Sequence, residues 1–336
     1  MNSVTNKIAF FSTQPYDKVF FNKYNESGFQ LDFFETQLNP QTVILIENGS
    51  VVCVFVNDMV NEEVIRQLAE KKVKIIALRC AGFNNVDLEA AKKYNLKVCR
   101  VPAYSPQAVA EHAMAMILTL NRKTHKAYNR VREQNFSLNG LLGFDLFGKT
   151  IGIIGTGNIG KAFAKIASGF GCKVLAYDIV ENDEMLKDGV SFVGLEDIFK
   201  LSDIISLHCP LNDQTKHLIN KKSIDSMKDS VMIINTSRGG LIETASVIEG
   251  LKDGKIGYLG IDVYEQEEKL FFRDLSDDII QDDAIQRLMS FPNVLVTAHQ
   301  AFFTNEALTQ IALVTFGNIE SLLLDNDIEN KSALLV

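Results

Sequence analysis

Hydrophobic residues follow two alternating patterns along the first third of the chain. Short runs rich in β-branched and other apolar residues predict strands at 8–11, 51–56, 74–78 and 96–100. Between them, residues 61–72 and 86–94 repeat their apolar positions three and four apart, which predicts amphipathic helices. Strands that alternate with helices favour a parallel sheet covered by helices on both faces.

A second series with the same rhythm begins at Lys149. Its predicted strands, each running into a loop, lie at 150–155, 173–178, 203–210, 231–239, 258–265 and 294–300. Residues 158–170 form a predicted helix within this series, and residues 305–324 form a long amphipathic helix after it. Between the two series, Pro102 and Pro106 interrupt the chain before a long apolar helix, which suits a passage between domains.

With 336 residues, the chain is longer than one hydrophobic core usually supports, so we expect two domains. The expected fold class is α/β, with two doubly wound parallel-sheet domains. One domain, at 102–299, is predicted to have the Rossmann fold. It is predicted to be inserted in a flavodoxin-like domain built from residues 1–101 plus 300–336.

Charge and composition exclude some classes of partner. The formal net charge of -8 repels phosphate backbones, which argues against nucleic-acid binding. The five cysteines form no CxxC pair, as is usual for the reduced thiols of a cytosolic protein. No apolar run is long enough to span a bilayer, and the one near the N-terminus is too short for a signal peptide. We therefore expect a soluble, cytoplasmic protein.

The strand at 150–155 runs into a loop with the spacing GxGxxG, formed by Gly155, Gly157 and Gly160. Alone, this spacing also fits a plain turn between a strand and a helix. Here a helix follows, and the next strand ends in Asp178, eighteen residues after Gly160. Gly155 permits a tight turn, and Gly157 lets the backbone approach a pyrophosphate. Gly160 lets the helix and the strand pack closely. Asp178 would bind ribose hydroxyls and repel a 2′-phosphate, so we predict a dinucleotide site that favours NAD over NADP.

Four later strand ends carry polar residues, at the edge of the sheet where doubly wound folds bind ligands. In chain order these residues are His208, Cys209, Pro210 and Asn212, then Thr236, Ser237 and Arg238, then Asp262, Glu265 and Glu267, and last His299. No group among them has the spacing of metal ligands. Elsewhere, His112 lies in an apolar helix and is expected to serve packing or an interface, whereas His217 lies in polar surroundings.

Three of these side chains could act together on a 2-oxoacid. Each also has a simpler interpretation: Arg238 as a surface arginine, Glu267 as a solvated carboxylate, and His299 as a structural histidine. However, a guanidinium holds a carboxylate through two parallel hydrogen bonds. A carboxylate beside an imidazole favours the imidazolium, which can protonate a carbonyl oxygen as hydride arrives from a nicotinamide. Spacing alone does not choose between Glu265 and Glu267 as the acid.

Four segments and Asp178 resemble the D-2-hydroxyacid dehydrogenase family over nearly the whole length of the chain. The segments are 155–160, 235–240, 260–274 and 298–302. Residues 270–283 are most similar to members that reduce pyruvate to D-lactate with NADH, so the resemblance implies that reaction and those substrates. It also implies a homodimer or a homotetramer. Alternatives are a preference for bulkier 2-oxoacids, a non-catalytic NAD-sensing corepressor, and a methyltransferase that uses S-adenosylmethionine.

The resemblance also implies roles for individual residues. Arg238 would bind the substrate carboxylate, and His299 would be the acid/base, paired with Glu267 rather than Glu265. Asp262 would lie near the nicotinamide. The other residues implied to bind the cofactor are Gly155, Gly157, Asn158, Ile159, Gly160, Asp178, Cys209, Pro210, Asn212, Thr236, Ser237 and again Arg238. The other residues implied to bind the substrate are Ala81 and Gly82, through backbone N–H groups, and Tyr104 and Phe302, through their side chains.

Overall fold

The computed structural model describes residues 7–336, apart from the side chain of Lys269. Contacts between residues divide the chain into two compact units. The first consists of Met1–Ser105 and Phe303–Val336, and the second of Pro106–Phe302. The second unit is thus inserted in the sequence of the first, and the division falls a few residues beyond the one that the sequence predicts.

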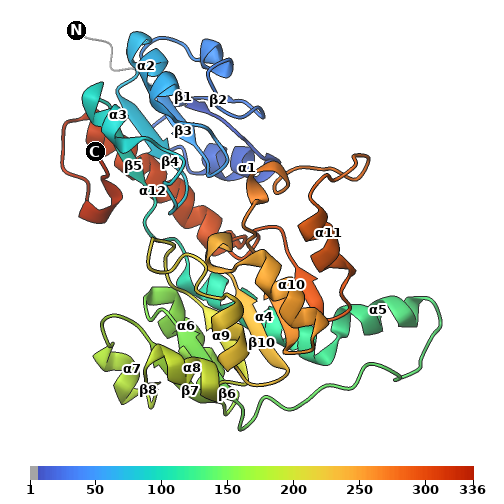
Figure 1. The fold of residues 1–336 in the computed structure, drawn as a ribbon. Coiled ribbons are helices and arrows are strands. Elements are labelled where there is room, and N and C mark those ends of the chain that lie inside the picture. Colours follow the sequence, from blue (N-terminus) through green and yellow to red (C-terminus); the bar gives the residue numbers. More distant parts are fainter. Residues whose placement is uncertain (1–6) are drawn as a thin grey trace. The chain divides into compact units, whose positions relative to one another are not determined.

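The first unit contains a five-stranded parallel sheet in the order β2–β1–β3–β4–β5 (Figure 1). Its strands are β1 (Lys7–Phe10), β2 (Gln30–Phe33), β3 (Val51–Val54), β4 (Ile75–Leu78) and β5 (Lys97–Arg100). Its helices are α1 (Pro15–Lys23), α2 (Glu62–Glu70), α3 (Leu88–Lys93) and α12 (Asn305–Leu323), with short 3₁₀ turns η1 (Thr42–Leu45) and η4 (Lys331–Ala333). Helix α1 connects β1 to β2 at one edge of the sheet, whereas α2 and α3 connect β3 to β4 and β4 to β5, toward the other edge. Right-handed crossovers therefore place α1 on the opposite face from α2 and α3, and α12 packs beside α1.

The second unit contains a seven-stranded parallel sheet in the order β12–β11–β10–β9–β6–β7–β8. Its strands are β6 (Thr150–Ile154), β7 (Lys173–Tyr177), β8 (Ser191–Phe192), β9 (Ile204–Leu207), β10 (Val231–Asn235), β11 (Ile256–Ile261) and β12 (Val294–Val296). Its helices are α4 (Pro106–Arg122), α5 (Thr124–Arg132), α6 (Asn158–Gly169), α7 (Asp183–Lys187), α8 (Leu195–Leu201), α9 (Lys221–Ser226), α10 (Thr244–Lys252) and α11 (Asp283–Ser290), with 3₁₀ turns η2 (Gly239–Leu241) and η3 (Glu267–Lys269). Two parallel sheets with covering helices confirm the predicted α/β class.

Apolar side chains cover both faces of the seven-stranded sheet. On one face, α4 and α6 contribute Ile117 and Phe163 to a buried cluster. On the other face, α8, α9 and α11 contribute Ile198, Ile224 and Leu288 to a second cluster. A strand buried on both sides needs apolar residues at successive positions, which is why these strands appear in the sequence as continuous apolar runs.

The connection of the strands reverses direction beside β6. From β6 the chain continues to β7 and β8 on one side, and then returns to pair β9 with the other side of β6. The loops that follow β6 and β9 therefore leave the sheet in opposite directions, and such a switch point is where doubly wound sheets bind ligands. The glycine loop (residues 155–160) follows β6 and lies at this point.

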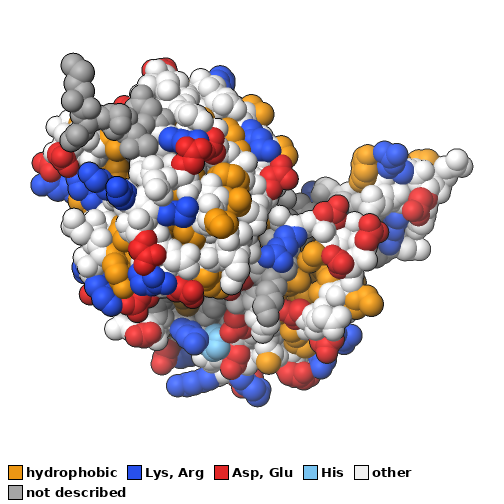
Figure 2. Space-filling view, turned by 90° about the horizontal axis from the view of Figure 1, so that it is seen from above, with side chains coloured by type: hydrophobic (Ala, Val, Ile, Leu, Met, Phe, Trp, Pro, Cys, Tyr) orange, Lys and Arg blue, Asp and Glu red, His pale blue; other side chains and the backbone are white. Residues whose placement is uncertain are grey.

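The surface carries charges of both signs. On the face drawn in Figure 2, Lys and Arg side chains are intermixed with Asp and Glu side chains. Within residues 7–336, no helix is both long and apolar enough to cross a membrane.

Candidate active site

The glycine loop has the geometry of a phosphate cradle. Gly155 has a φ of +98°, and a Cβ there would lie 2.5 Å from backbone atoms of the chain that leaves β9. A Cβ on Gly160 would lie 2.0 Å from the carbonyl oxygen of Gly155. At Gly157, by contrast, a Cβ would meet no described atom within 4 Å, and Asn158 and Ile159 start α6 beside it. Two glycines thus serve close packing, and the third leaves open space at a helix N-terminus, which fits a pyrophosphate.

Asp178 follows β7 and holds the glycine loop through its carboxylate. Oδ2 accepts hydrogen bonds from Thr156 N at 2.5 Å and from Thr156 Oγ1 at 2.9 Å. Oδ1 accepts one from Ile179 N at 2.7 Å. The carboxylate stands at the end of the second strand, where this fold places the acid that binds ribose hydroxyls. Its charge disfavours a 2′-phosphate, so the site suits NAD better than NADP.

The loops after β9 and β10 are joined beside the sheet edge, where Ser237 Oγ donates to Cys209 O at 2.6 Å. Thr236 Oγ1 is buried and has no hydrogen-bond partner among the described residues, so a bound molecule could satisfy it. Pro210 lies in the first of these loops. The side-chain oxygen of Asn212 accepts hydrogen bonds from Gln214 N and Thr215 N, within its own loop.

Arg238 directly follows the buried strand β10, in a loop held tightly in place. Its carbonyl oxygen accepts from Asn235 Nδ2 at 2.8 Å, and its guanidinium Nη1 donates to Ser237 O at 2.7 Å. A Cβ on Gly239 would lie 2.1 Å from the carbonyl carbon of Tyr264. Glycine is therefore required at 239, where this loop packs on the chain after β11. The backbone of Arg238 is held in place by these contacts, and its side chain extends from a fixed position.

The two acids after β11 contact two different histidines. Glu267 Oε1 lies 2.9 Å from His299 Nδ1, and its Oε2 accepts from Tyr264 N at 2.9 Å. Glu265 Oε1 instead lies 2.6 Å from His217 Nε2. Burial alone would raise the pKa of Glu265, but the hydrogen bonds that it accepts hold its pKa below the ordinary value. Of the two acids that spacing did not distinguish, Glu267 is the one that contacts His299.

The backbone around His299 is constrained by Asp262, which is completely buried. His299 has a left-handed φ of +53°, and its N–H donates to Asp262 O at 2.7 Å. The Asp262 carboxylate accepts from Thr297 Oγ1 at 2.5 Å, from Gln300 N at 2.8 Å and from Ala301 N at 2.9 Å. The resemblance predicts a place for Asp262 beside the nicotinamide. In the structure, both of its oxygens hold the turn that carries His299.

His112 on α4 also belongs to this network, which the sequence did not reveal. Its Nε2 lies 3.4 Å from Asp262 Oδ1 and 3.2 Å from Thr297 Oγ1. Burial alone would raise the pKa of the Asp262 carboxyl, but hydrogen bonds from His112, Thr297 and a backbone N–H hold its pKa below its ordinary value. The only signal in the sequence was a polar residue within an apolar helix.

In the first unit, the loop after β4 contains Ala81 and Gly82. Cys80 O accepts from Val101 N at 3.2 Å, and Ala81 O accepts from Arg100 Nη1 at 2.8 Å. In a planar trans peptide, the N–H points opposite to the carbonyl. The N–H group of Ala81 therefore points away from Val101 N, and that of Gly82 points away from the Arg100 guanidinium.

The two other predicted substrate residues lie near the ends of the units. Tyr104 lies in the first unit, between β5 and α4, and Phe302 is a buried residue at the end of the second. Within residues 7–336, no group of three or more His, Cys, Asp or Glu side chains is placed to hold a metal ion.

Comparisons with known proteins show the family to which this chain is similar. Residues 114–301 match the family described as "D-isomer specific 2-hydroxyacid dehydrogenase, NAD binding domain". The chain is 53% identical over 317 residues to a D-lactate dehydrogenase of Escherichia coli, which covers 94% of this chain and 96% of the relative. It is 52% identical over 323 residues to "2-hydroxyacid dehydrogenase homolog 1" of Schizosaccharomyces pombe, covering 96% and 97%. The solved structure of the pyruvate reductase of Chlamydomonas reinhardtii superimposes with a TM-score of 0.93 at 45% identity, covering 97% of this chain and 99% of that one.

Proposed function

This chain belongs to the family of NAD-dependent, D-isomer specific 2-hydroxyacid dehydrogenases, and we propose that it reduces pyruvate to D-lactate. The names of two similar proteins, a D-lactate dehydrogenase and a pyruvate reductase, support this choice of substrate. The observation that carries the chemistry is the 2.9 Å contact between Glu267 Oε1 and His299 Nδ1. This pair stands after β11 and β12, at the same edge of the sheet as the Arg238 loop and the glycine loop.

The Glu267 contact determines which nitrogen of His299 can react. An ionised carboxylate only accepts hydrogen bonds, so Nδ1 carries a hydrogen atom. Nε2 is then protonated only in the imidazolium, which is the form that donates a proton to the carbonyl oxygen of pyruvate. In the reverse direction, neutral Nε2 accepts the hydroxyl proton of D-lactate. The negative charge of Glu267 stabilises the imidazolium and fixes the plane of the ring.

Arg238 is proposed to hold the substrate. Its guanidinium can bind the carboxylate of pyruvate through two parallel hydrogen bonds, which fix orientation as well as charge. The backbone N–H groups of Ala81 and Gly82 are proposed as further donors to the same carboxylate, with Tyr104 and Phe302 as side chains that contact the substrate.

The residues for the cofactor fit a dinucleotide. The glycine loop and the first turn of α6 would hold the pyrophosphate, and Asp178 would hold the adenosine ribose. When bound, the reduced nicotinamide supplies the hydride that is added to the carbonyl carbon. Thr236 Oγ1, buried without a partner among the described residues, would gain one from the bound cofactor.

A panel of 2-oxoacids tests the proposal. Pyruvate and branched and aromatic 2-oxoacids are assayed with NADH and with NADPH, and the product is separated on a chiral column. We expect the highest kcat/KM with pyruvate and NADH, and a product of the D configuration. A higher kcat/KM with a bulkier 2-oxoacid would overturn the proposed substrate. Binding of NADH without turnover of any 2-oxoacid would indicate a sensor in place of an enzyme.

A further inference from the structure

The second histidine–carboxylate pair is not part of the proposed reaction. Glu265 Oε1 lies 2.6 Å from His217 Nε2, and Glu265 Oε2 accepts from Thr244 Oγ1 at 3.0 Å. These three side chains, the Glu265 cluster, come from three different elements: the loop after β9, the first residue of α10 and the loop after β11. Because an ionised carboxylate cannot donate, His217 Nε2 and Thr244 Oγ1 are both the donors.

The backbone of the Arg238 loop is enclosed by the segments that the Glu265 cluster joins. His217 N donates to Gly240 O at 2.8 Å, so the loop after β9 supports it on one side. On another side, Gly239 packs on the Tyr264–Glu265 peptide so closely that a Cβ would lie 2.4 Å from Glu265 N. The η2 turn then leads from the Arg238 loop to Thr244 at the start of α10.

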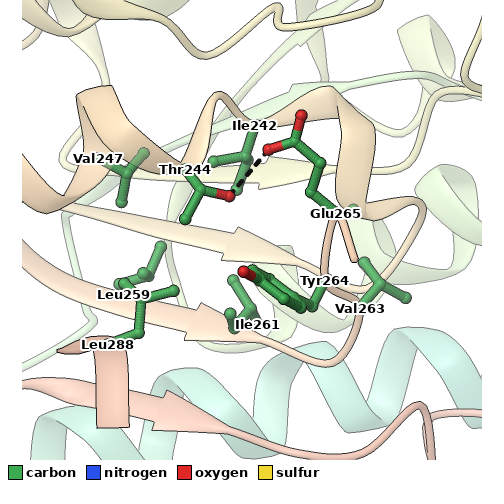
Figure 3. A pocket seen from close by; sticks show the side chains of 10 residues that line it. Ile242, Thr244, Val247, Leu259, Ile261, Val263, Tyr264, Glu265 and Leu288 are labelled. Atoms are coloured by element: carbon green, nitrogen blue, oxygen red, sulfur yellow. Dashed lines mark hydrogen bonds between the residues drawn. The ribbon is translucent and has the colours of Figure 1, made fainter. Parts of the chain in front are cut away.

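Figure 3 shows what lies beside this cluster. The Thr244 hydroxyl and the Glu265 carboxylate face each other above a floor of apolar side chains. The hollow among them is lined by Ile242, Val247, Leu259, Ile261 and Leu288, among others, and has a volume of about 10 Å³. This is the space of roughly one water molecule, so the hollow holds no ligand of the size of a 2-oxoacid.

We propose that the Glu265 cluster is a positioning device that fixes the direction of the Arg238 guanidinium without touching the substrate. The proposal rests on the proposed function, since it assigns to Arg238 the binding of the substrate carboxylate. Charge-assisted hydrogen bonds are shorter and stronger than neutral ones, which suits the 2.6 Å contact between Glu265 and His217. The preceding peptide, Val263–Tyr264, supplies Tyr264 N to Glu267, so the cluster ties the substrate-binding loop to the proton-donating pair.

Thr244 offers the cleanest variant, because valine replaces the hydroxyl by a methyl group of nearly the same shape. Thr244→Val and Glu265→Gln each remove part of the cluster, and Thr244→Ser restores the hydroxyl. Glu196→Gln is the matched control, since it removes one negative charge from an exposed ion pair with Lys200 on α8. For each purified enzyme, the KM for pyruvate, the KM for NADH, the kcat, the inhibition constant of oxamate and the Tm are measured.

In Thr244→Val and Glu265→Gln, we expect the KM for pyruvate and the inhibition constant of oxamate to rise about tenfold. The KM for NADH should stay unchanged, and Thr244→Ser and Glu196→Gln should behave like the wild type. An unchanged KM for pyruvate in both variants would overturn the proposal. So would a parallel loss of Tm, NADH binding and kcat, because that pattern indicates general loosening of the unit. If Glu265→Gln does not fold, the KM for pyruvate of Thr244→Val, compared with that of Thr244→Ser, still tests the proposal.

The two proposals fail in different ways. If the wild type does not reduce pyruvate, the proposed substrate is wrong, whatever the variants do. The same variants are then measured with the 2-oxoacid that the wild type reduces best. An unchanged KM for that 2-oxoacid would overturn the positioning role on its own.

Discussion

Replacing Glu267 by glutamine should separate charge from shape at His299, the proposed proton donor. One carboxylate oxygen lies 2.9 Å from His299 Nδ1, and the other accepts from Tyr264 N at 2.9 Å. A glutamine amide has one acceptor and one donor: with its oxygen toward His299, its NH₂ faces Tyr264 N–H, and with its NH₂ toward His299, Nδ1 can no longer carry the hydrogen atom. A buried donor without its acceptor costs about 1–3 kcal/mol. The two side chains are only 20% and 22% exposed, so solvent compensates little of this cost.

The carboxylate of Glu267 stabilises the imidazolium, which is the form that gives up its proton, so its loss makes the reactive form less stable. Since about 1.4 kcal/mol corresponds to tenfold in rate, a cost of about 1–3 kcal/mol predicts that Glu267→Gln lowers the rate of pyruvate reduction by about fivefold to 150-fold.

The assay is single-turnover oxidation of NADH at saturating pyruvate, so that product release does not hide the chemical step. Glu268→Gln, which changes the exposed neighbouring acid, is the control for loss of charge. A wild-type rate in Glu267→Gln would refute the role given to this pair.

Four further outcomes are expected. Arg238→Lys should lower kcat/KM for pyruvate by about 100-fold or more in steady-state assays, because an ammonium cannot make the two-pronged contact. Asp178→Ser should raise the ratio of kcat/KM with NADPH to that with NADH, as repulsion of the 2′-phosphate is removed. Gly160→Ala should weaken NADH binding and lower the Tm, since its Cβ would lie 2.0 Å from a backbone oxygen. The folded pKa of Asp262 is depressed, so its stabilisation is present above the ordinary carboxyl value of 3.8 and is lost as the pH falls through the folded pKa. Urea unfolding below that pH should therefore show a smaller acid-induced loss of stability in Asp262→Asn than in the wild type.

Most of the sheet architecture could be predicted from the sequence, because strands buried on both faces must be continuously apolar. β3 and β4, for example, are buried at every position and stand out as apolar runs. β2 (Gln30–Phe33) was not predicted, since it lies at a sheet edge, is partly exposed and mixes polar with apolar residues. β8 has only two residues, too few for any period to show.

The loops were predictable only in part. The glycine spacing identified the phosphate cradle, because the need for glycine is local and follows from backbone geometry. The partners of His112 and His217 could not be predicted, since each contacts an acid far away in the sequence that only the packing of the sheet brings near. For the same reason, spacing did not distinguish Glu265 from Glu267.

The two histidines that contact glutamates share an unusual backbone. His217 has a φ of +52° and His299 a φ of +53°, in a region that residues with a Cβ rarely adopt. Such a conformation costs about 1–3 kcal/mol and persists only where the surroundings fix it by several contacts. At His299 those contacts are the hydrogen bonds of Asp262, which hold the residue itself and both residues that follow it. At His217 they are the bond to Gly240 O and the carboxylate of Glu265. Hydrogen bonds to carboxylates thus fix the left-handed backbone or the imidazole at both places, which is the kind of support that such a conformation needs.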